Sequence, residues 1–289
     1  MKRMRTGVIT DETAAKTWLA AACPRVWELL NQRAQQKLPP GLAPPWTDHA
    51  KEWWAFADAQ ITALRVACGE QEVRDAYGPD LSRATTAARV MELISELSVS
   101  AALGTLPPRF RLRPSTGRGT YSDFALEFAG VPMYGEVKRY EDRWFSTPRD
   151  PARGRALVKA PPGSSAIGQA DRPRSMDIVS KLRAVPRQFP EGTVNMLFVH
   201  HPSFGDSYRY VQAALFGHET ALVAPEAIGV SAADGLFAAD EWRRVSACYL
   251  THIDPTHGTW FPVEWRNPRA DVPLPTKVRK AVARLREPR

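Results

Sequence analysis

The stretch that decides the fold is YSDFALEFAGVPMYGEVKRY, residues 121–140. Two runs that read as strands, 121–128 and 131–140, flank Ala129-Gly130, which suits a tight two-residue turn. We therefore expect an antiparallel hairpin, whose turn brings the start of the first strand beside the end of the second.

The charged residues of this hairpin carry the chemistry. Glu136 and Lys138 are two residues apart and project from one face, whereas Val137 points the other way, into the core. Asp123 starts the first strand, so the turn can bring its carboxylate beside Glu136. Adjacent carboxylates repel each other unless a cation lies between them, and oxygen ligands suit Mg²⁺ or Mn²⁺. An exposed charge pair with no chemistry would give the same pattern.

The rest of the chain predicts helices and strands around the hairpin. Helices are predicted over residues 11–38, 48–68, 82–103, 175–189, 208–216 and 276–285. Further strands are predicted at residues 110–113, 194–199, 245–253 and 260–265. Gly78-Pro79 is expected to interrupt the chain, so that Asp80 or Ser82 caps the helix that follows. This order predicts an α/β layer fold with a mixed sheet.

The composition is that of an ordinary globular protein. The chain has 289 residues, of which 44% are hydrophobic and 24% charged, so wholesale disorder and a fibrous repeat are not expected. Cys23, Cys68 and Cys248 are far apart and form no Cys-x-x-Cys pair, which favours a reducing, cytoplasmic location. No apolar run approaches the ~20 residues of a membrane helix, so no membrane association is expected.

Three segments are predicted. Residues 1–80 form a Trp-rich helical region, residues 81–265 the main α/β domain, and residues 266–289 a basic C-terminal tail. Five of the nine tryptophans lie in the first 54 residues. We expect these tryptophans to pack the helices together; a platform for stacked bases is the alternative.

The positive charge is segregated along the chain. The formal net charge is +8, and residues 138–187 carry 12 basic against 5 acidic groups. Residues 266–289 carry 8 basic against 2 acidic groups, whereas residues 188–265 carry 3 against 9. Clustered Lys and Arg suit a polyanion such as nucleic acid, although a solubilising face would give the same count.

These residues resemble the PD-(D/E)xK nuclease superfamily, over about residues 82–200. The family order runs from a helical carboxylate to a hairpin with Asp and then Glu-x-Lys, followed by a helix and a core strand. Matching residues are Glu92 or Glu96, Asp123, Glu136-Val137-Lys138, the helix with Lys181 and Gln188, and strand 194–199. Ser122 stands where the family has Pro. The resemblance implies a restriction-endonuclease-like mixed sheet flanked by helices, with the N-terminal helices as an accessory region.

The resemblance also implies a metal-dependent endonuclease. Asp123, Glu136 and the backbone carbonyl of Val137 would bind Mg²⁺ or Mn²⁺, and Lys138 would position the hydrolytic water. On a helical wheel Glu96 is closer to the apolar stripe than Glu92, so we favour Glu96 as the helical acid, with Glu92 as an alternative. Accessory contacts are expected from Lys181 and Gln188.

The expected substrate is DNA, with RNA left open, and the setting is bacterial restriction, anti-phage defence or a mobile element. The expected nucleic-acid contacts are Arg111, Arg113, Arg118, Arg139, Arg143, Arg149, Arg153, Arg155 and Lys159. Many such nucleases work as dimers, so a homodimer or a partner subunit of a defence system is also expected. The alternative is a catalytically inactive module of the same fold that binds nucleic acid or a partner protein.

Overall fold

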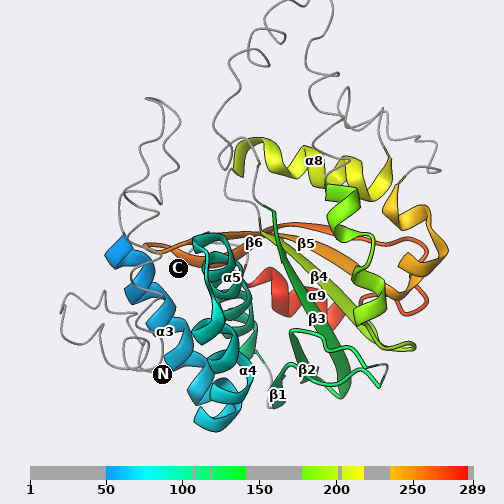
Figure 1. Cartoon of the computed structure of the whole chain (residues 1–289). Coiled ribbons are helices and arrows are strands. Elements are labelled where there is room, and N and C mark those ends of the chain that lie inside the picture. Colours follow the sequence, from blue (N-terminus) through cyan, green and yellow to red (C-terminus); the bar gives the residue numbers. More distant parts are fainter. Residues whose placement is uncertain are drawn as a thin grey trace, which may run out of the picture.

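The computed structural model describes residues 50–106, 109–117, 119–140, 178–200, 204–217 and 235–285. It is an α/β structure in which one six-stranded mixed sheet has helices on both faces (Figure 1). The predicted helix over 11–38 and the long loop after residue 140 lie outside the described residues.

The strands follow one another across the sheet in chain order. They are β1 (Arg109–Leu112), β2 (Phe124–Phe128), β3 (Val131–Arg139), β4 (Val194–His200), β5 (Ala247–Asp254) and β6 (Gly258–Arg266). The β1–β2, β2–β3 and β5–β6 pairs are antiparallel, whereas β3, β4 and β5 run parallel. The predicted mixed sheet is therefore confirmed, with the short edge strand β1 at its rim.

The helices pack on either side of this sheet. They are α3 (Ala50–Cys68), α4 (Glu70–Arg83), α5 (Ala87–Gly104), α8 (Phe204–Phe216) and α9 (Thr276–Ala283). Three 3-10 helices are η3 (Val185–Gln188), η5 (Leu236–Ala238) and η6 (Asp240–Arg244). Within the described ranges, no helix combines the length and the apolar character needed to cross a membrane.

The hairpin forms as its sequence predicts. Ala129 and Gly130 have φ angles of 53° and 78°, as a two-residue turn with two left-handed positions requires. Phe128 pairs with Val131 across that turn. The strand pairing is thereby fixed by the turn, and it determines which side chains share a face.

Two hydrophobic cores lie on opposite faces of the sheet. Helices α3, α4, α5 and α9 bury the first core, and α8, η3, η5 and η6 border the second. Figure 1 shows α8 on one side of the sheet and α3 and α5 on the other. The central strand β4 is buried along its whole length, as its continuous apolar run predicts.

Aromatic rings fill the first core next to the hairpin. Phe124 of β2 stacks on Phe110 at a centroid distance of 5.6 Å and touches Phe198 of β4 at 5.8 Å. The ring of Phe124 lies over Gly135 of β3, where a Cβ atom would overlap it. The absence of a side chain at Gly135 therefore makes room for the ring that anchors β2.

The predicted boundary at Gly78-Pro79 is wrong. Helix α4 runs through Pro79, and the break comes later, so α5 begins after Thr86, whose Oγ1 accepts a hydrogen bond from the Arg89 N–H at 3.2 Å. A proline inside a helix costs about 3 kcal/mol. Burial of apolar side chains at helical spacing offsets this cost; these are Val73, Ala76, Tyr77 and Leu81. As a result Asp80 lies within a helix and does not cap one.

The second helical prediction that changes is the one over residues 175–189. The described part is helical at 178–182 and then continues as the separate 3-10 helix η3 (Val185–Gln188), because Pro186 cannot continue the α-helical hydrogen bonds. By contrast, the basic helix predicted near the C-terminus is confirmed as α9.

The predicted segment boundaries at residues 80 and 265 do not coincide with a gap in the core. Side chains of α3 and α4 share one cluster with the sheet, and so do Val278 and Val282 of α9. The backbone N–H of Phe261 on β6 also donates to the carbonyl of Leu285 at 3.1 Å. Residues 50–80 and 276–285 are therefore built into the same core as the strands.

Candidate active site

The site begins where the β2–β3 ladder stops. The pairing ends at Phe124 and Gly135, and Asp123 comes directly before β2. The N–H of Asp123 donates to the Gly135 carbonyl at 3.0 Å, and the N–H of Val137 donates to Asp123 Oδ2 at 2.6 Å. The Asp123 carboxylate thus accepts the hydrogen bond that the Val137 N–H would otherwise donate to a backbone carbonyl. Because the N–H and C=O of an extended residue point to the same side, the Val137 carbonyl also faces Asp123.

Glu136 brings a second carboxylate to this place. Its side chain is 1% exposed, and Lys138 Nζ donates a hydrogen bond to its Oε1. Its Oε2 is buried and has no hydrogen-bond partner among the described residues. A buried carboxylate oxygen without a donor is costly, so this oxygen is available to a cation.

Helix α5 supplies the third acid. The side chain of Glu96 is 12% exposed and that of Glu92 is 36% exposed, in agreement with the helical wheel. The charge of Asp123 raises the pKa of both Glu96 and Glu136, and Glu96 raises that of Glu136 as well. Glu96 and Glu136 are buried and Asp123 is half-buried, and Arg113 connects Asp123 with Glu96 through its backbone N–H and its guanidinium group.

Burial is the main cause of the perturbed titration there, and mutual repulsion adds to it. Together they raise the pKa of Glu96 and of Glu136 to about 8. Burial also raises the pKa of Asp123, although Lys138 opposes this shift. Burial alone would lower the pKa of Lys138, but the charges of Glu136 and Asp123 raise it, so this lysine stays cationic.

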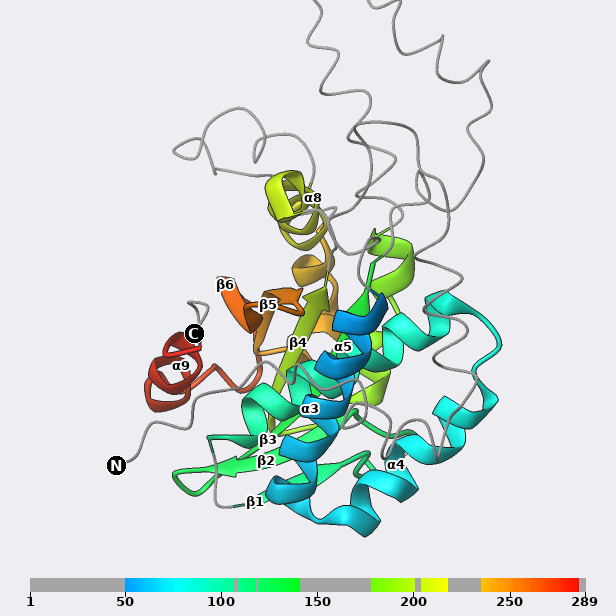
Figure 2. The same cartoon turned by 90° about the vertical axis from the view of Figure 1, so that its left-hand side faces the viewer.

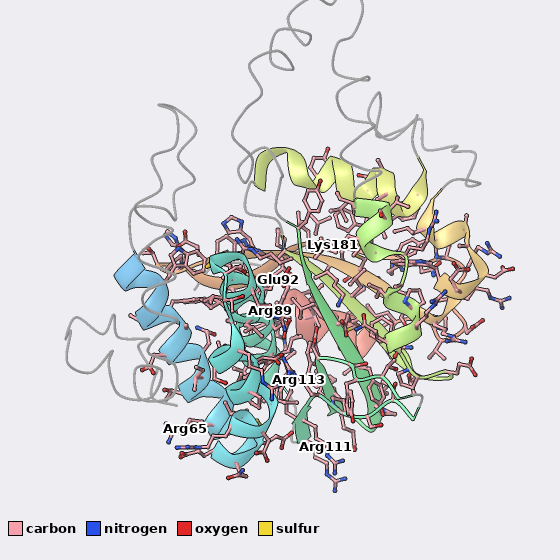
Figure 3. All side chains as sticks on the ribbon, viewed as in Figure 1. Arg65, Arg89, Glu92, Arg111, Arg113 and Lys181 are labelled. Carbon is pink, nitrogen blue, oxygen red and sulfur yellow. The ribbon has the colours of Figure 1, made fainter. Side chains whose placement is uncertain are left out.

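Two arginines bracket Glu96. Arg89 Nη1 lies 3.7 Å from Glu96 Oε1, and Arg113 Nη2 lies 3.4 Å from Oε2. Both guanidinium groups also reach Asp80 Oδ2, at 3.0 Å and 2.7 Å. Arg89 makes a further ion pair with Glu92 at 3.1 Å. Figure 3 shows Arg89 and Glu92 on α5, with Arg113 below them.

Sequence reasoning had not assigned a role at the site to Arg89 or to Asp80. Arg89 precedes Glu92 by three and Glu96 by seven residues, so helical spacing could have placed it on the same face. The sequence pattern predicts a helix start near Asp80 and therefore a capping role for this residue. Only the true helix boundary shows that its side chain reaches the site.

The two accessory residues lie at the border of the site. Lys181 Nζ donates to the Arg139 carbonyl and lies 3.7 Å from Glu92 Oε1. Gln188 takes part through its backbone, whose carbonyl accepts from Ser122 Oγ at 2.8 Å. The segment carrying Lys181 is thereby placed next to α5, and Gln188 next to the start of β2.

The predicted nucleic-acid contacts divide into separate groups. Arg139 is 3% exposed and donates to Ser95 Oγ at 3.2 Å, so the prediction that it contacts a bound polyanion is wrong. Arg111 lies on the exposed face of β1 and projects from the lower rim, whereas Arg113, whose positive φ ends the strand alternation, pairs with Asp80 and Glu96 (Figure 3). The remaining predicted residues lie outside the described ranges; they are Arg118, Arg143, Arg149, Arg153, Arg155 and Lys159.

The acids fit a hard divalent cation. Asp123, Glu136 and the Val137 carbonyl would supply oxygen ligands, and Glu136 Oε2 is buried without a donor among the described residues. In the described part of the chain, no three side chains of His, Cys, Asp or Glu form a ready-made metal cluster. Mg²⁺ is ordinarily held by one or two carboxylates, with water and substrate phosphate completing its octahedron. Two carboxylates and a carbonyl are therefore a sufficient set.

Comparison with known proteins adds no relative. No protein-family model, curated protein or solved structure matches this chain. The functional conclusion therefore depends on the geometry and charges of the site and on the order of its residues along the chain.

The raised pKa values predict how metal binding depends on pH. Between about pH 4.5 and 8 the folded protein keeps protons on Glu96 and Glu136 that the unfolded chain loses, so these acids lower its stability as the pH rises. A divalent cation needs the ionised acids. We expect Mn²⁺ to raise the Tm more at about pH 9 than at about pH 6, as measured by scanning calorimetry. An equal gain at both values would contradict a site made of these acids.

Proposed function

We propose that this protein is a metal-dependent nuclease of the PD-(D/E)xK type that hydrolyses phosphodiester bonds in DNA. The observation that carries the proposal is a single arrangement: Asp123 accepts a hydrogen bond from the N–H of Val137, the neighbouring Glu136 and Lys138 pair with each other, and Arg113 connects Asp123 with Glu96 of α5. Glu136 Oε2 is buried there without a hydrogen-bond donor among the described residues, and a bound cation would satisfy this oxygen.

Each side chain has a distinct task in this proposal. Asp123 and Glu136, with the Val137 carbonyl, would hold one Mg²⁺ or Mn²⁺ ion. That ion supplies Lewis acidity and lowers the pKa of bound water. Lys138 stays protonated beside Glu136, so its Nζ can donate to the attacking water or to a phosphate oxygen. Glu96 adds an acceptor at the same place from α5.

The architecture supports a restriction-endonuclease-like fold. A helix with the acid Glu96 packs against the strand with Glu136 and Lys138, and β4 follows in parallel pairing with β3. This is the order that the resemblance implied. A role in restriction, anti-phage defence or a mobile element, in the cytoplasm and as a dimer or a partner subunit, belongs to the same proposal.

The test is cleavage of nucleic acid by the purified full-length chain. Plasmid DNA, single-stranded DNA and RNA are incubated with Mg²⁺ or Mn²⁺, and parallel samples contain a chelator. We expect nicking or cutting of DNA that needs the metal. If the protein bound Mn²⁺ but cleaved no substrate with either metal ion, the nuclease proposal would be contradicted, and a binding module would be the better description.

The second candidate is such a module, and helix α9 is the observation that favours it. Lys277, Lys280 and Arg284 are exposed, follow one another at helical spacing, and pair with no acid in the described part of the chain. By contrast, the positive charges of Arg243 and Arg269 are offset, because each of these arginines pairs with an aspartate at 2.8 Å. Figure 2 shows α9 and α4, the helix that carries Asp80, on opposite sides of α3 and α5.

Charge reversal on α9 is expected to weaken DNA binding in a salt-dependent way. Each lost phosphate contact lowers the slope of log K against log salt by about 0.9, so Lys277→Glu, Lys280→Glu and Arg284→Glu together should lower it by about 2 to 3. Fluorescence anisotropy without metal measures this slope. Lys280→Glu alone is compared with Arg83→Glu, an exposed charge on α4. An unchanged slope in the triple variant would rule out this face.

A further inference from the structure

Arg113 has an unusual backbone. Its φ angle is 44°, in the left-handed region that a residue with a side chain adopts only at an energetic cost. It follows β1 directly, so an extended conformation was open to it. Such an outlier persists only where surrounding contacts fix it, and these contacts tend to belong to functional sites.

The contacts of Arg113 join two of the three acids. Its N–H donates to the Asp123 carbonyl at 2.9 Å, and its Nη2 lies 3.4 Å from Glu96 Oε2. The same Nη2 donates to Asp80 Oδ2 at 2.7 Å. Its Cζ lies 5.0 Å from the ring centre of the buried Tyr77, within the range of a cation–π contact. One residue therefore fixes the backbone of Asp123 and the side chain of Glu96.

Asp80 lies behind this arrangement. Its Oδ2 accepts from both Arg89 and Arg113, and these arginines then face different oxygens of Glu96. A carboxylate held from both sides by planar guanidinium groups has little freedom to rotate. In the described part of the chain Asp80 is connected to Glu96 through these two arginines, so its influence on that acid passes through them.

We propose that Asp80 and Arg113 are positioning residues, which set the place of Glu96 relative to Asp123 before the metal binds. This inference depends on the proposed function, since it concerns the same site. Ion pairs that serve only stability would make a different prediction. Their loss would lower the Tm but leave the affinity for Mn²⁺ unchanged.

The experiment measures Mn²⁺ affinity by calorimetry, together with kcat and KM for DNA. Arg113→Ala keeps the backbone N–H that binds the Asp123 carbonyl and removes only the guanidinium group that holds Glu96. Residues that orient groups at a metal site typically contribute about 10-fold to 100-fold in affinity, and we expect Arg113→Ala to lose that much. Arg113→Lys keeps the charge but not the planar fork, so it should restore only part of the loss. We expect kcat to fall while KM for DNA changes little. Arg65→Ala, which breaks an exposed ion pair with Glu70, is the matched control.

Two further variants separate positioning from folding. Arg113→Gly removes the guanidinium but adopts a φ of 44° without strain, so it keeps the test open if Arg113→Ala does not fold. In a double-mutant cycle, Asp80→Asn should weaken Mn²⁺ binding in the wild type and much less in the Arg113→Gly background. Additive effects would overturn the coupling between Asp80 and Arg113.

The outcomes are distinguishable. Wild type that binds Mn²⁺ and cleaves DNA, with Arg113→Gly equal to it, overturns this inference and leaves the proposed function intact. Wild type that neither binds Mn²⁺ nor cleaves overturns the proposed function, and the inference with it. Weaker Mn²⁺ binding in Arg113→Gly, partial restoration in Arg113→Lys and no effect in Arg65→Ala would support it.

Discussion

Changing Glu136 to Gln is expected to remove metal-dependent cleavage and, at the same time, to raise the Tm of the metal-free protein at about pH 9. Gln has the shape of Glu but lacks its charge, so the cation loses a ligand. We expect the cleavage rate to fall by at least about 10²-fold to 10³-fold, the usual effect of losing one preorganised electrostatic contact.

The gain in stability follows from the same buried charge. Burial and Asp123 raise the pKa of Glu136 to about 8, so its ionised form destabilises the fold above that pH. Neutral Gln avoids this penalty, and no such gain is expected at about pH 6, where Glu136 is already protonated. Melting curves at both pH values, with and without Mn²⁺, measure the effect.

Glu264→Gln is the control for this variant. Glu264 lies on β6 with a side chain that is 7% exposed, and it accepts from the hydroxyl of Tyr249 at 3.4 Å. The Glu264→Gln variant should cleave DNA at the rate of the wild type. If Glu136→Gln lowered the Tm at about pH 9 and still cleaved, Glu136 would be an ordinary structural ion-pair partner of Lys138.

Gly135→Ala is expected to destabilise the whole hairpin. The new methyl group would overlap the ring of Phe124, which is fully buried and held between Phe110 and Phe198. Overpacking of this kind costs about 1–3 kcal/mol. For a domain of this size, each kcal/mol lowers the Tm by about 2–4 °C. Urea unfolding and calorimetry give both quantities.

Gly78→Ala is the matched control, and its effect should have the opposite sign. Gly78 lies within α4, and no heavy atom lies within 4 Å of the position that its Cβ would occupy. Alanine in a helix interior is favoured over glycine by about 0.5–1 kcal/mol. Equal destabilisation by both substitutions would show that the overlap with Phe124 is not the cause.

Local sequence patterns predicted most of the sheet, because strand alternation and turn chemistry act over a few residues. Ala129-Gly130 specifies a tight turn by itself, and the apolar run of β4 specifies a buried strand. The α4–α5 boundary was misplaced because Pro79 is a local signal. The burial that overrides it comes from the packing of Tyr77 and Leu81 in the assembled core.

The site could be predicted only in part, for the same reason. Asp123, Glu136 and Lys138 lie on one hairpin, so residue spacing along two strands was enough to bring them together. Arg113 was expected to contact nucleic acid together with Arg111. Instead, the left-handed φ of Arg113 turns its side chain towards Asp80, and arginine has no intrinsic preference that would predict this backbone conformation.

The position at which β2 ends determines whether the acids of the hairpin can form a site. The carboxylate of Asp123 accepts a hydrogen bond from the Val137 N–H only because the backbone pairing of β2 with β3 ends at Phe124, the residue next to Asp123. One further pair would put a peptide carbonyl in that position, and the same acids would then form an ordinary strand with no place for an ion. If the proposed function is correct, a variant that keeps all of these acids but extends this strand by one pair is expected to lose Mn²⁺ binding.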